Sequence, residues 1–584
     1  MVSDSFFLQQ LKSCDLFHGL SANEITELYA FMTTVHIKAG DVLVRLGDPS
    51  DSLHVLLSGR LIVKNALGQA VGQISRGQTV GEMGLITQEP RSATVIALRD
   101  SLLLQLDSEH FMEVCRKHPS VLLEVAKTIT RRLQRTLQAK QNYSNASNIV
   151  IFPAHRGVNV GLFMEKLSSR FNQQFRYRTI AHQDFPKNIS TNDLHGAIQE
   201  IENNHDYLFY EAGDDKKWRE FCLDRADHIY VLADASHAGG FDPDLLDTIK
   251  GVQNDIKKML VLLHDGWGPP TNTQDWLDRL SFSQHHHVCW HEQGDFDRLL
   301  RFVSGSAVGL VLGGGGTRSW AHAGVIKYLF ENNVTIDACA GTSAGAISAA
   351  LMLAARDLQD FLDMSNLLSR SMRFNEYTIP LASLLSSKSF THALQTIFGA
   401  IKVEDLRTRL FCVAADLVSV SEVVISRGLV WRCLRATAAI PGIYPPVHDG
   451  DRLLIDGGVV NNLPVDVMKD YFDGAGQVIA VDISEVDAHE VAYNYPLDLN
   501  WRWILRHKIF SRRSDFHLPP LAGTLMKGMV LASDLKSFRN IKLSTVAIRP
   551  VLSGYGLLDF SKKDELLAIG HAAAAESLKD WPKI

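Results

Sequence analysis

The sequence lacks paired cysteines, a leader segment and long apolar runs. Its seven cysteines are scattered and none stands in a C-x-x-C motif, which argues against a disulfide framework or a zinc module and suits a reducing cytoplasm. The N-terminus has no basic segment followed by an apolar one, and no apolar run approaches the roughly 18 to 20 residues that span a bilayer. We therefore expect a cytoplasmic protein, soluble or peripheral to the inner face of a membrane.

A basic character is also absent. The formal net charge is −6, so we expect no nucleic-acid partner held by bulk charge. The histidine tract at 285–287 has no second ligand cluster at matching spacing, and we interpret it as a solvated loop rather than a metal site. The 584 residues, 46% of them hydrophobic, indicate a globular protein of about three to five domains.

The first part of the chain is rich in short β-forming runs. Turn signals at Gly40, Gly47 and Gly59 separate these runs, and helical spacing begins after Leu106. Residues 1–138 therefore predict a β-roll bracketed by helices. The small, polar residues of 139–148 predict a linker.

The remainder of the chain carries two alternating βα patterns. Residues 149–305 show short apolar runs separated by helical stretches, which indicate a parallel α/β domain. They contain no Walker-type Gly-Lys-Ser loop, so we assign them no chemistry and interpret them as a structural or interface domain. A second pattern occupies 306–475, and residues 476–584 are mixed and mostly helical, as a C-terminal part of the same domain.

A G-x-S-x-G pentapeptide runs from Gly341 to Gly345 in this last domain. An apolar strand precedes it and a helix of small residues follows. In a strand–turn–helix of this kind, flanking glycines let a serine sit exposed on a strained turn. Ser343 is therefore a candidate nucleophile, and it needs a base and donors for an oxyanion.

Four consecutive glycines at 313–316 lie between a strand and a helix, about 30 residues before Ser343. Their N–H groups have no side chain in the way, so the segment predicts an oxyanion hole, assisted by Arg318. The alternative is a nucleotide-phosphate loop. Neither an acidic ribose ligand nor a P-loop lysine follows to support it.

Asp456 is the candidate base, because it ends a predicted strand and precedes two glycines, Gly457 and Gly458. A carboxylate there can reach a serine at the end of a neighbouring strand. Histidines also follow Asp456 in the chain. Chain order alone therefore leaves open a Ser-Asp-His triad of the α/β-hydrolase type, with one of the histidines at positions 489, 507, 517 and 571.

The segments "GGGGTR", "GTSAG" and "DGG" together resemble patatin-like phospholipases, and "RATAAIPGIYPPV" with "DGGVVNNLPVDVM" looks like their neuropathy target esterase branch. The resemblance implies a three-layer α/β/α catalytic domain that needs no cofactor. It also implies a Ser343–Asp456 dyad without histidine, which would release fatty acid from lysophospholipids or phospholipids through an acyl-enzyme. The alternative is a catalytically weak scaffold that binds lipid or nucleotide.

By the same resemblance, the oxyanion region comprises Gly314, Gly315, Gly316 and Arg318, and the motif glycines are Gly341, Gly345, Gly457 and Gly458. One position departs from the family pattern. Ser319 stands where the family loop usually has a glycine. A positive φ at this position would be sterically less favourable for serine than for glycine.

The predicted roll contains "GQTVGEMGLITQEPRSATVIAL", in which backbone amides and an arginine can hold an anion. The alternative is a barrel turn with a surface ion pair. The spacing resembles the cyclic nucleotide-binding domain, with cAMP or cGMP as a regulator. That resemblance implies a cassette that begins at Gly81, with Glu82 on the ribose, Arg91 and Ser92 on the cyclic phosphate, and a helix carrying Thr136 over the base.

A transcription factor of the cAMP-receptor type would also begin with such a roll. It would need a helix-turn-helix after the linker, whereas residues 149 onward show the βα pattern. We therefore expect no nucleic-acid partner, and the resemblance to patatin-like phospholipases implies a lipid substrate instead. Trp501 and Trp503 lie among basic residues in "NWRWILRHKIFSRR", which predicts an interfacial helix in contact with a membrane or, alternatively, a surface helix packed on the core.

The expected fold class is multidomain α/β. It comprises an N-terminal β-roll of the cyclic nucleotide-binding type, a middle parallel α/β domain and a C-terminal patatin-like three-layer α/β/α domain.

Overall fold

The computed structural model describes most of the 584 residues. The described residues are 11, 14, 16–17, 20–65, 70–74, 77–82, 89–118, 121–122, 148–171, 175–186, 194, 197–198, 201–202, 204–213, 215–237, 240–252, 256–266, 268, 270–371, 376–484, 497–501, 504, 521–555 and 562–582. Contacts between Cα atoms divide the chain into two compact units, Met1–Val261 with Ser281–His285 and Leu262–Leu280 with His286–Ile584.

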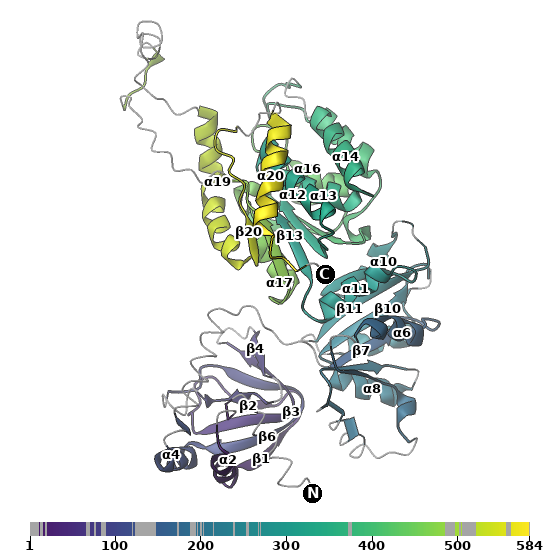
Figure 1. Ribbon diagram of the computed structural model, residues 1–584, viewed down its shortest axis with the longest axis vertical. Coiled ribbons are helices and arrows are strands. Elements are labelled where there is room, and N and C mark those ends of the chain that lie inside the picture. The colour runs from purple at the N-terminus through teal and green to yellow at the C-terminus, as the bar shows by residue number, and fades with distance from the viewer. Residues whose placement is uncertain are drawn as a thin grey trace. The chain divides into compact units, whose positions relative to one another are not determined.

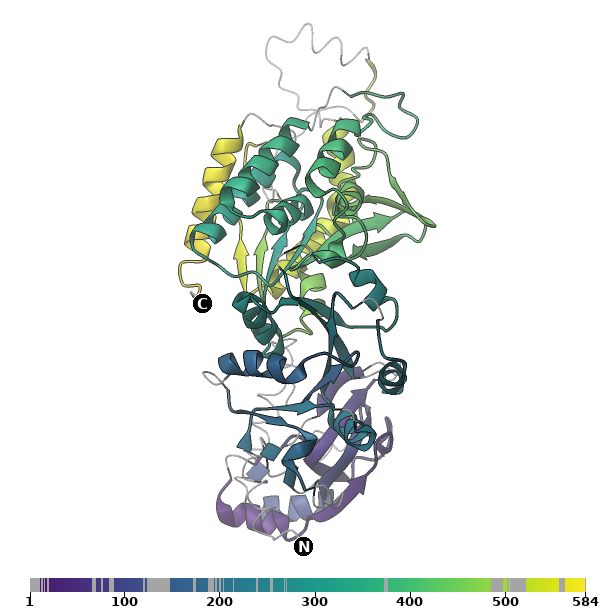
Figure 2. The same cartoon turned by 90° about the vertical axis from the view of Figure 1, so that its right-hand side faces the viewer.

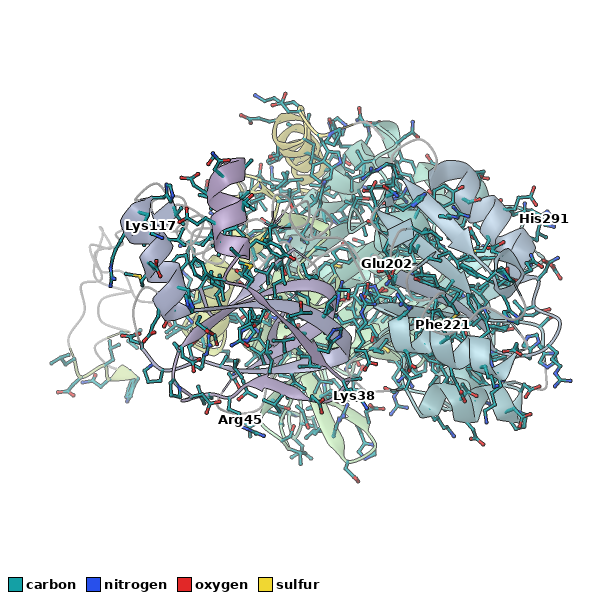
Figure 3. All side chains as sticks on the ribbon, turned by 90° about the horizontal axis from the view of Figure 1, so that it is seen from below. Lys38, Arg45, Lys117, Glu202, Phe221 and His291 are labelled. Atoms are coloured by element: carbon teal, nitrogen blue, oxygen red, sulfur yellow. The ribbon has the colours of Figure 1, made fainter. Side chains whose placement is uncertain are left out.

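The first sheet is an antiparallel roll. Its strands are β1 (Thr33–Ile37), β2 (Val42–Val44), β3 (Ser52–Lys64), β4 (Ala70–Ile74), β5 (Thr79–Val80) and β6 (Thr94–Asp107). They pair in the order β1-β6-β3-β4, with β2 on β6 and β5 on β3. Helix α2 (Ala22–Tyr29) precedes the roll and α4 (Ser108–Lys117) follows it, and Lys38, Arg45 and Lys117 lie on its surface (Figure 3). The prediction of a β-roll with flanking helices is confirmed.

The second sheet is built from β7 (Asn148–Pro153), β8 (Tyr177–Ile180), β9 (Tyr207–Glu211), β10 (His228–Asp234), β11 (Lys257–His264) and β12 (Gln284–Cys289). Their order is β12-β11-β10-β7-β9-β8, and β7, β8, β9 and β10 run parallel. The connections carry η1 (His182–Asp184), α6 (Val160–Phe171), α8 (Lys216–Arg225), α9 (Pro243–Lys250) and α10 (Thr273–Leu277), and α11 (Gln293–Val303) follows β12. This arrangement confirms the predicted parallel α/β pattern.

The histidine tract at 285–287 was expected to be a solvated loop, and this prediction is wrong. The three residues lie inside β12 and are buried. Burial lowers the pKa of His286 to about 3, so its ring is neutral and packs against Phe302. His287 bonds through Nε2 to the carbonyl of Glu404 at 2.9 Å. A neutral imidazole with a hydrogen-bond partner, such as that of His287, is tolerated in a core. The sequence of the tract alone did not show that the fold would bury it.

The third sheet contains β13 (Val308–Leu312), β14 (Ala338–Thr342), β15 (Arg409–Asp416), β16 (Ser421–Ile425), β17 (Val447–Asp449), β18 (Arg452–Asp456), β19 (Gln477–Val481) and β20 (Val546–Ile548). The order is β17-β18-β15-β14-β13-β19-β20, with β16 on β15. Strands β15, β14, β13, β19 and β20 run parallel, whereas β16 and β18 are antiparallel to β15.

Both faces of this sheet are covered by helices (Figure 1 and Figure 2). Leu310 and Leu312 of β13 pack into one apolar cluster and Val311 into another, as alternation along a strand requires. The first cluster includes α12 (Trp320–Glu331), α13 (Ala344–Ala354), α14 (Leu358–Ser371), α15 (Lys388–Phe398), α16 (Val430–Thr437) and α20 (Lys563–Ser577). The second includes α17 (Val465–Tyr471). The predicted three-layer α/β/α architecture is confirmed.

The remaining elements of this region are α19 (Leu521–Asn540) and four short 3₁₀ turns, η2 (Gly316–Ser319), η3 (Val403–Asp405), η4 (Gly457–Val459) and η5 (Ile541–Leu543). Turn η4 follows directly on strand β18, whereas residues 313–315 separate η2 from β13. Both turns contain glycines that the sequence singled out. Across the part of the chain that the structure describes, no helix has both the length and the apolar character that crossing a bilayer requires.

Candidate active site

Ser343 occupies the turn between β14 and α13. Its φ of 53° and ψ of −124° place a serine in a region that favours glycine, so the turn is strained. The neighbouring glycines are required sterically. A Cβ on Gly341 would lie 2.6 Å from the nitrogen of Ala346, and one on Gly345 only 2.1 Å from the carbonyl oxygen of Leu312. The motif therefore holds the serine at the carboxyl end of β14.

Asp456 reaches Ser343 from β18, an antiparallel strand beside β15. The hydroxyl of Ser343 donates to Oδ2 of Asp456 at 2.6 Å. The other carboxylate oxygen accepts a hydrogen bond from the N–H of Gly458 at 2.8 Å. A Cβ on Gly457 would lie 2.2 Å from the carbonyl oxygen of Val413, so the glycine after Asp456 permits the close approach of the two strands.

Burial is the main influence on the charge of Asp456. It raises the pKa of the carboxyl group to about 6, although the hydrogen bonds from Ser343 and Gly458 act in the opposite direction. Near neutral pH the group is thus mostly ionised and still basic enough to accept a proton. A pKa close to the working pH is the property that general-base catalysis needs.

The glycine loop after β13 uses two of its amides within the protein. The N–H of Gly313 donates to the carbonyl of Val481 at 3.0 Å, and that of Gly314 to the carbonyl of Asn462 at 3.1 Å. Gly314 was expected to donate to an oxyanion, but its N–H is engaged here. Within the described residues, the N–H groups of Gly315 and Gly316 have no such acceptor. These are the amides of the loop that are available to donate to an oxyanion.

Arg318 and Ser319 belong to η2. Arg318 is buried, and its Nε donates to the carbonyl of Tyr555 at 2.8 Å. Its guanidinium therefore ties the glycine loop to the C-terminal part of the chain. Ser319 has a φ of −58°, so the departure from the family's glycine requires no left-handed backbone and causes no strain.

Two residues that the sequence interpretation did not assign hold the glycine loop. His322 is fully buried, and its Nε2 lies 2.7 Å from the carbonyl oxygen of Gly313. Burial lowers its pKa to about 4, so the ring is neutral and donates from Nε2 to that oxygen. Asn462 accepts from the N–H of Gly314 and donates from Nδ2 to the carbonyl of Gly314 at 3.1 Å. The available signals were the histidine of "SWAHAG", directly after "GGGGTR", and the second asparagine of "DGGVVNN".

The triad alternative receives no support from the described histidine that follows Asp456. His571 bonds through Nε2 to Glu331 at 2.8 Å. The other three histidines considered for this role, at positions 489, 507 and 517, lie outside the described residues. The partner of the Ser343 hydroxyl in this structure is a carboxylate.

Ser343 opens onto an apolar cavity of about 100 Å³. The walls come from η2 with the start of α12, from α13, from α14 and from the turn after α16. The lining side chains include Trp320, Ile347, Leu351, Phe361, Leu368, Ile440, Ile443 and Tyr444. A serine and a carboxylate at the wall of such a cavity can attack an ester whose acyl part is apolar.

In the roll, Arg91 is buried and points at Gly81. Its Nη2 donates to the carbonyl of Ser52 at 2.7 Å, whereas Nε and Nη1 are buried without a hydrogen-bond partner among the described residues. A Cβ on Gly81 would lie 2.0 Å from Nη1, so this glycine makes room for the arginine. Glu82 accepts a hydrogen bond from Thr79 at 3.1 Å.

Of the other predicted binding residues, the structure gives the exposure of Ser92 and Trp501. Ser92 is exposed beside Arg91. Trp501 is described and is 69% exposed. The predicted contacts of Thr136 and Trp503, and residues 139–147 of the predicted linker, lie outside the described residues.

Comparison with known families finds three matches. Residues 310–469 match the patatin-like phospholipase model, residues 34–118 the cyclic nucleotide-binding domain, and residues 145–299 the P-loop like domain of the Neuropathy Target Esterase family. The predicted resemblance to the esterase branch, with a nucleotide-binding domain at its N-terminus, is confirmed. The middle domain, to which the sequence interpretation assigned no chemistry, is thus similar to one found in that family.

Among similar proteins, an uncharacterised NTE family protein of Mycobacterium tuberculosis is 27% identical over 98% of this chain and 97% of its own length. Lysophospholipase NTE1 of Candida albicans is 25% identical over 99% of this chain. This chain spans 48% of the length of that lysophospholipase. Among solved structures, the N-terminal domain of a transcriptional regulator from Streptomyces coelicolor is 28% identical, covering 23% of this chain and 98% of that one, with a TM-score of 0.20.

Proposed function

We propose that this protein is a serine lipid esterase that releases fatty acid from lysophospholipids or phospholipids through an acyl-enzyme on Ser343. The observation that carries the proposal is the 2.6 Å hydrogen bond from the strained serine to Asp456, at the wall of an apolar cavity. The similarity to patatin-like phospholipases and to named lysophospholipases supports the substrate class.

The geometry suggests how the reaction proceeds. Asp456 takes the proton of Ser343 as the hydroxyl oxygen attacks the ester carbonyl. The N–H groups of Gly315 and Gly316 stabilise the negative charge on the carbonyl oxygen. The protonated Asp456 then returns its proton to the leaving alcohol. A water molecule then attacks the acyl-enzyme while Asp456 takes one of its protons. The ester bond to Ser343 breaks, the proton passes to the serine oxygen and the fatty acid leaves, so the cycle needs no cofactor.

The cavity fits the acyl part of such a substrate rather than its headgroup, because its lining is mostly apolar. Its volume of about 100 Å³ is below the roughly 300 Å³ at which small-molecule sites usually begin. A long acyl chain will therefore extend beyond it.

Fatty-acid release by the purified full-length protein tests the proposal. We expect turnover of lysophosphatidylcholine and of a soluble p-nitrophenyl ester. A folded protein that hydrolyses no lysophospholipid, phospholipid or soluble ester would favour the alternative of a catalytically silent scaffold.

The pH dependence of this activity should follow Asp456. We expect kcat/KM for a soluble ester to rise with pH and to reach half its plateau near pH 6, because only the ionised carboxylate accepts the proton of Ser343. The measurement is a pH profile between pH 4.5 and 8.5. A half-point near pH 4, the ordinary pKa of aspartate, would show that burial does not raise the pKa of the general base.

Replacing Asn462 with alanine should lower kcat and leave KM nearly unchanged. The side-chain amide fixes the carbonyl of Gly314, and the neighbouring amides act on the transition state rather than on the bound substrate. We expect a decrease of about 10- to 100-fold, from the cost of misplacing an oxyanion donor. Asn332→Ala, which removes a similar 3.0 Å bond to the carbonyl of Tyr328, serves as control. A change in KM alone would assign Asn462 to substrate binding.

We also propose that the roll binds cAMP or cGMP as a regulator. The supporting observation is the buried guanidinium of Arg91, whose Nε and Nη1 lack protein partners in the described region; a cyclic phosphate would supply them. Titration calorimetry should detect binding of cAMP or cGMP and a loss of about tenfold or more in affinity for Arg91→Ala. No heat with either nucleotide at millimolar concentration would leave the roll a structural role.

A further inference from the structure

Residues 376–387, which directly precede α15, form a small loop. The N–H of Thr378 donates to the carbonyl of Leu384 at 3.0 Å, and that of Ser386 to the carbonyl of Glu376 at 2.9 Å. Tyr377 and Leu385 form an antiparallel bridge. Leu385 is buried and anchors the loop from inside. The backbone of the loop is thus held by internal hydrogen bonds.

The outward side chains of this loop are apolar. Tyr377 and Ile379 are each 76% exposed, Leu381 is 91% exposed and Leu384 52%. No Asp, Glu, Lys or Arg occurs from residue 377 to 387. Large apolar side chains held outward on a fixed loop are costly in water and commonly mark an interaction site.

The base of the loop is bonded to the wall of the active-site cavity. The N–H of Leu384 donates to the carbonyl of Gly442 at 2.8 Å, and that of Leu385 to the carbonyl of Ile443 at 2.9 Å. Ile443 lines the cavity together with Ser343. The apolar projection therefore stands beside the site at which the ester is proposed to react.

A second apolar projection extends from the third sheet itself. Strand β15 runs parallel to β14, with Val413 opposite Thr342, so its carboxyl end lies at the edge that carries Ser343. The hairpin tip beyond it exposes Leu417, Val418 and Val420 by 50%, 66% and 88%. Val420 has a φ of 52°, a left-handed conformation that a β-branched residue rarely adopts.

We propose that these two projections, the apolar rim formed by Tyr377, Ile379, Leu381, Leu417, Val418 and Val420, seat the catalytic domain on a lipid surface. The choice of lipid rests on the proposed function, since a lipid ester must leave an aggregate to enter the cavity. The size of the rim supports the same choice. A stable protein interface uses about 20–30 residues on each side, whereas a few aliphatic and aromatic side chains suffice for contact with a lipid surface.

Sedimentation with phosphatidylcholine vesicles that contain lysophosphatidylcholine tests the proposal. We expect the full-length wild type to sediment with the vesicles. The double variant Ile379→Asp/Leu381→Asp should lose about tenfold or more of its vesicle affinity, because two charged groups would have to enter the lipid. Val418→Asp should act in the same direction from the other projection. Leu162→Asp, which places the same charge at a half-exposed leucine of α6, should bind vesicles as the wild type does.

Hydrolysis of a soluble ester keeps the two proposals apart. The double variant should retain soluble-ester turnover within about twofold, since a surface change leaves the dyad intact, and should lose turnover of vesicle-borne substrate in proportion to binding. Equal vesicle binding by wild type and both rim variants would overturn the lipid-surface proposal. A wild-type dimer that the rim variants convert to monomer would also overturn it, in favour of a second copy of this chain. Vesicle binding without any ester turnover would support the rim and refute the esterase.

Discussion

Replacing Ser343 with alanine should reduce kcat/KM for a soluble ester by about 10⁴-fold or more, the cost typical of removing a nucleophile. The reason is chemical, because no acyl-enzyme can form without the hydroxyl that donates to Asp456 at 2.6 Å. Initial rates with p-nitrophenyl esters and lysophosphatidylcholine measure the effect. Mass spectrometry after brief exposure to substrate should show an acyl adduct on the wild type and none on the variant.

The matched control is Ser348→Ala. Ser348 lines the same cavity from α13, is 8% exposed like Ser343, and donates only to the carbonyl of Ala344 at 3.0 Å. Its loss should leave turnover within about twofold, as expected for a residue outside the chemistry. Full turnover by Ser343→Ala would remove this serine from the mechanism.

Replacing Asp456 with asparagine should have the second largest effect, a loss of about 10⁴-fold in kcat, the magnitude seen when a buried catalytic aspartate becomes an amide. Asparagine has nearly the same shape but cannot take the proton of Ser343. The assay is again soluble-ester turnover, now at pH 8, where the wild-type carboxylate is fully ionised. Residual activity that still rises through pH 6 would mean that another group is the base.

The same variant should be more stable than the wild type at neutral pH. The pKa of Asp456 is raised from 3.8 to about 6, so the folded state holds this proton more tightly than the unfolded chain does. Stability is therefore lost as pH rises through about 6, by an amount on the order of 3 kcal/mol. Thermal unfolding of the protein should give a higher Tm for Asp456→Asn than for the wild type at pH 8, and this difference in Tm should shrink at pH 5.

Asp416→Asn provides a control with the opposite sign. Asp416 ends β15 and accepts hydrogen bonds from Ser419, Val418 and Leu453, which lower its pKa to about 2. Its carboxylate contributes stability above the unfolded pKa, and this is lost only as pH falls toward 2. The asparagine variant should therefore be less stable than the wild type at pH 8. If both variants shifted Tm in the same direction, the change would not report the charge of Asp456.

The local part of the site could be predicted from the sequence because it depends on neighbouring residues. A strand, two small residues around Ser343 and a helix of small residues are properties of neighbouring positions, and steric limits on φ and ψ act over the same range. Gly341, Gly345 and Gly457 are required by close backbone contacts. For this reason the sequence motifs located the candidate nucleophile, its candidate base and the glycine loop.

The use of each amide in the glycine loop could not be predicted in this way. The N–H of Gly314 is satisfied by the carbonyl of Asn462, which lies far along the chain. The roles of His322 and Asn462 likewise depend on carbonyls that the fold brings to them. The histidine tract failed as a prediction for the same reason, because its burial depends on the strands and helices packed around β12.

By itself, then, the sequence determined the order of the three patterns, the motif positions and the residues able to do the chemistry. Only the tertiary structure decided which of these groups meet. It joined a serine after one strand to a carboxylate on another and set the pKa of that carboxylate through burial. It also placed one exposed apolar projection beside the cavity and a second beyond the carboxyl end of β15. Those outcomes depend on packing between distant segments, whose free energy is fixed by the whole fold rather than by any short stretch of residues.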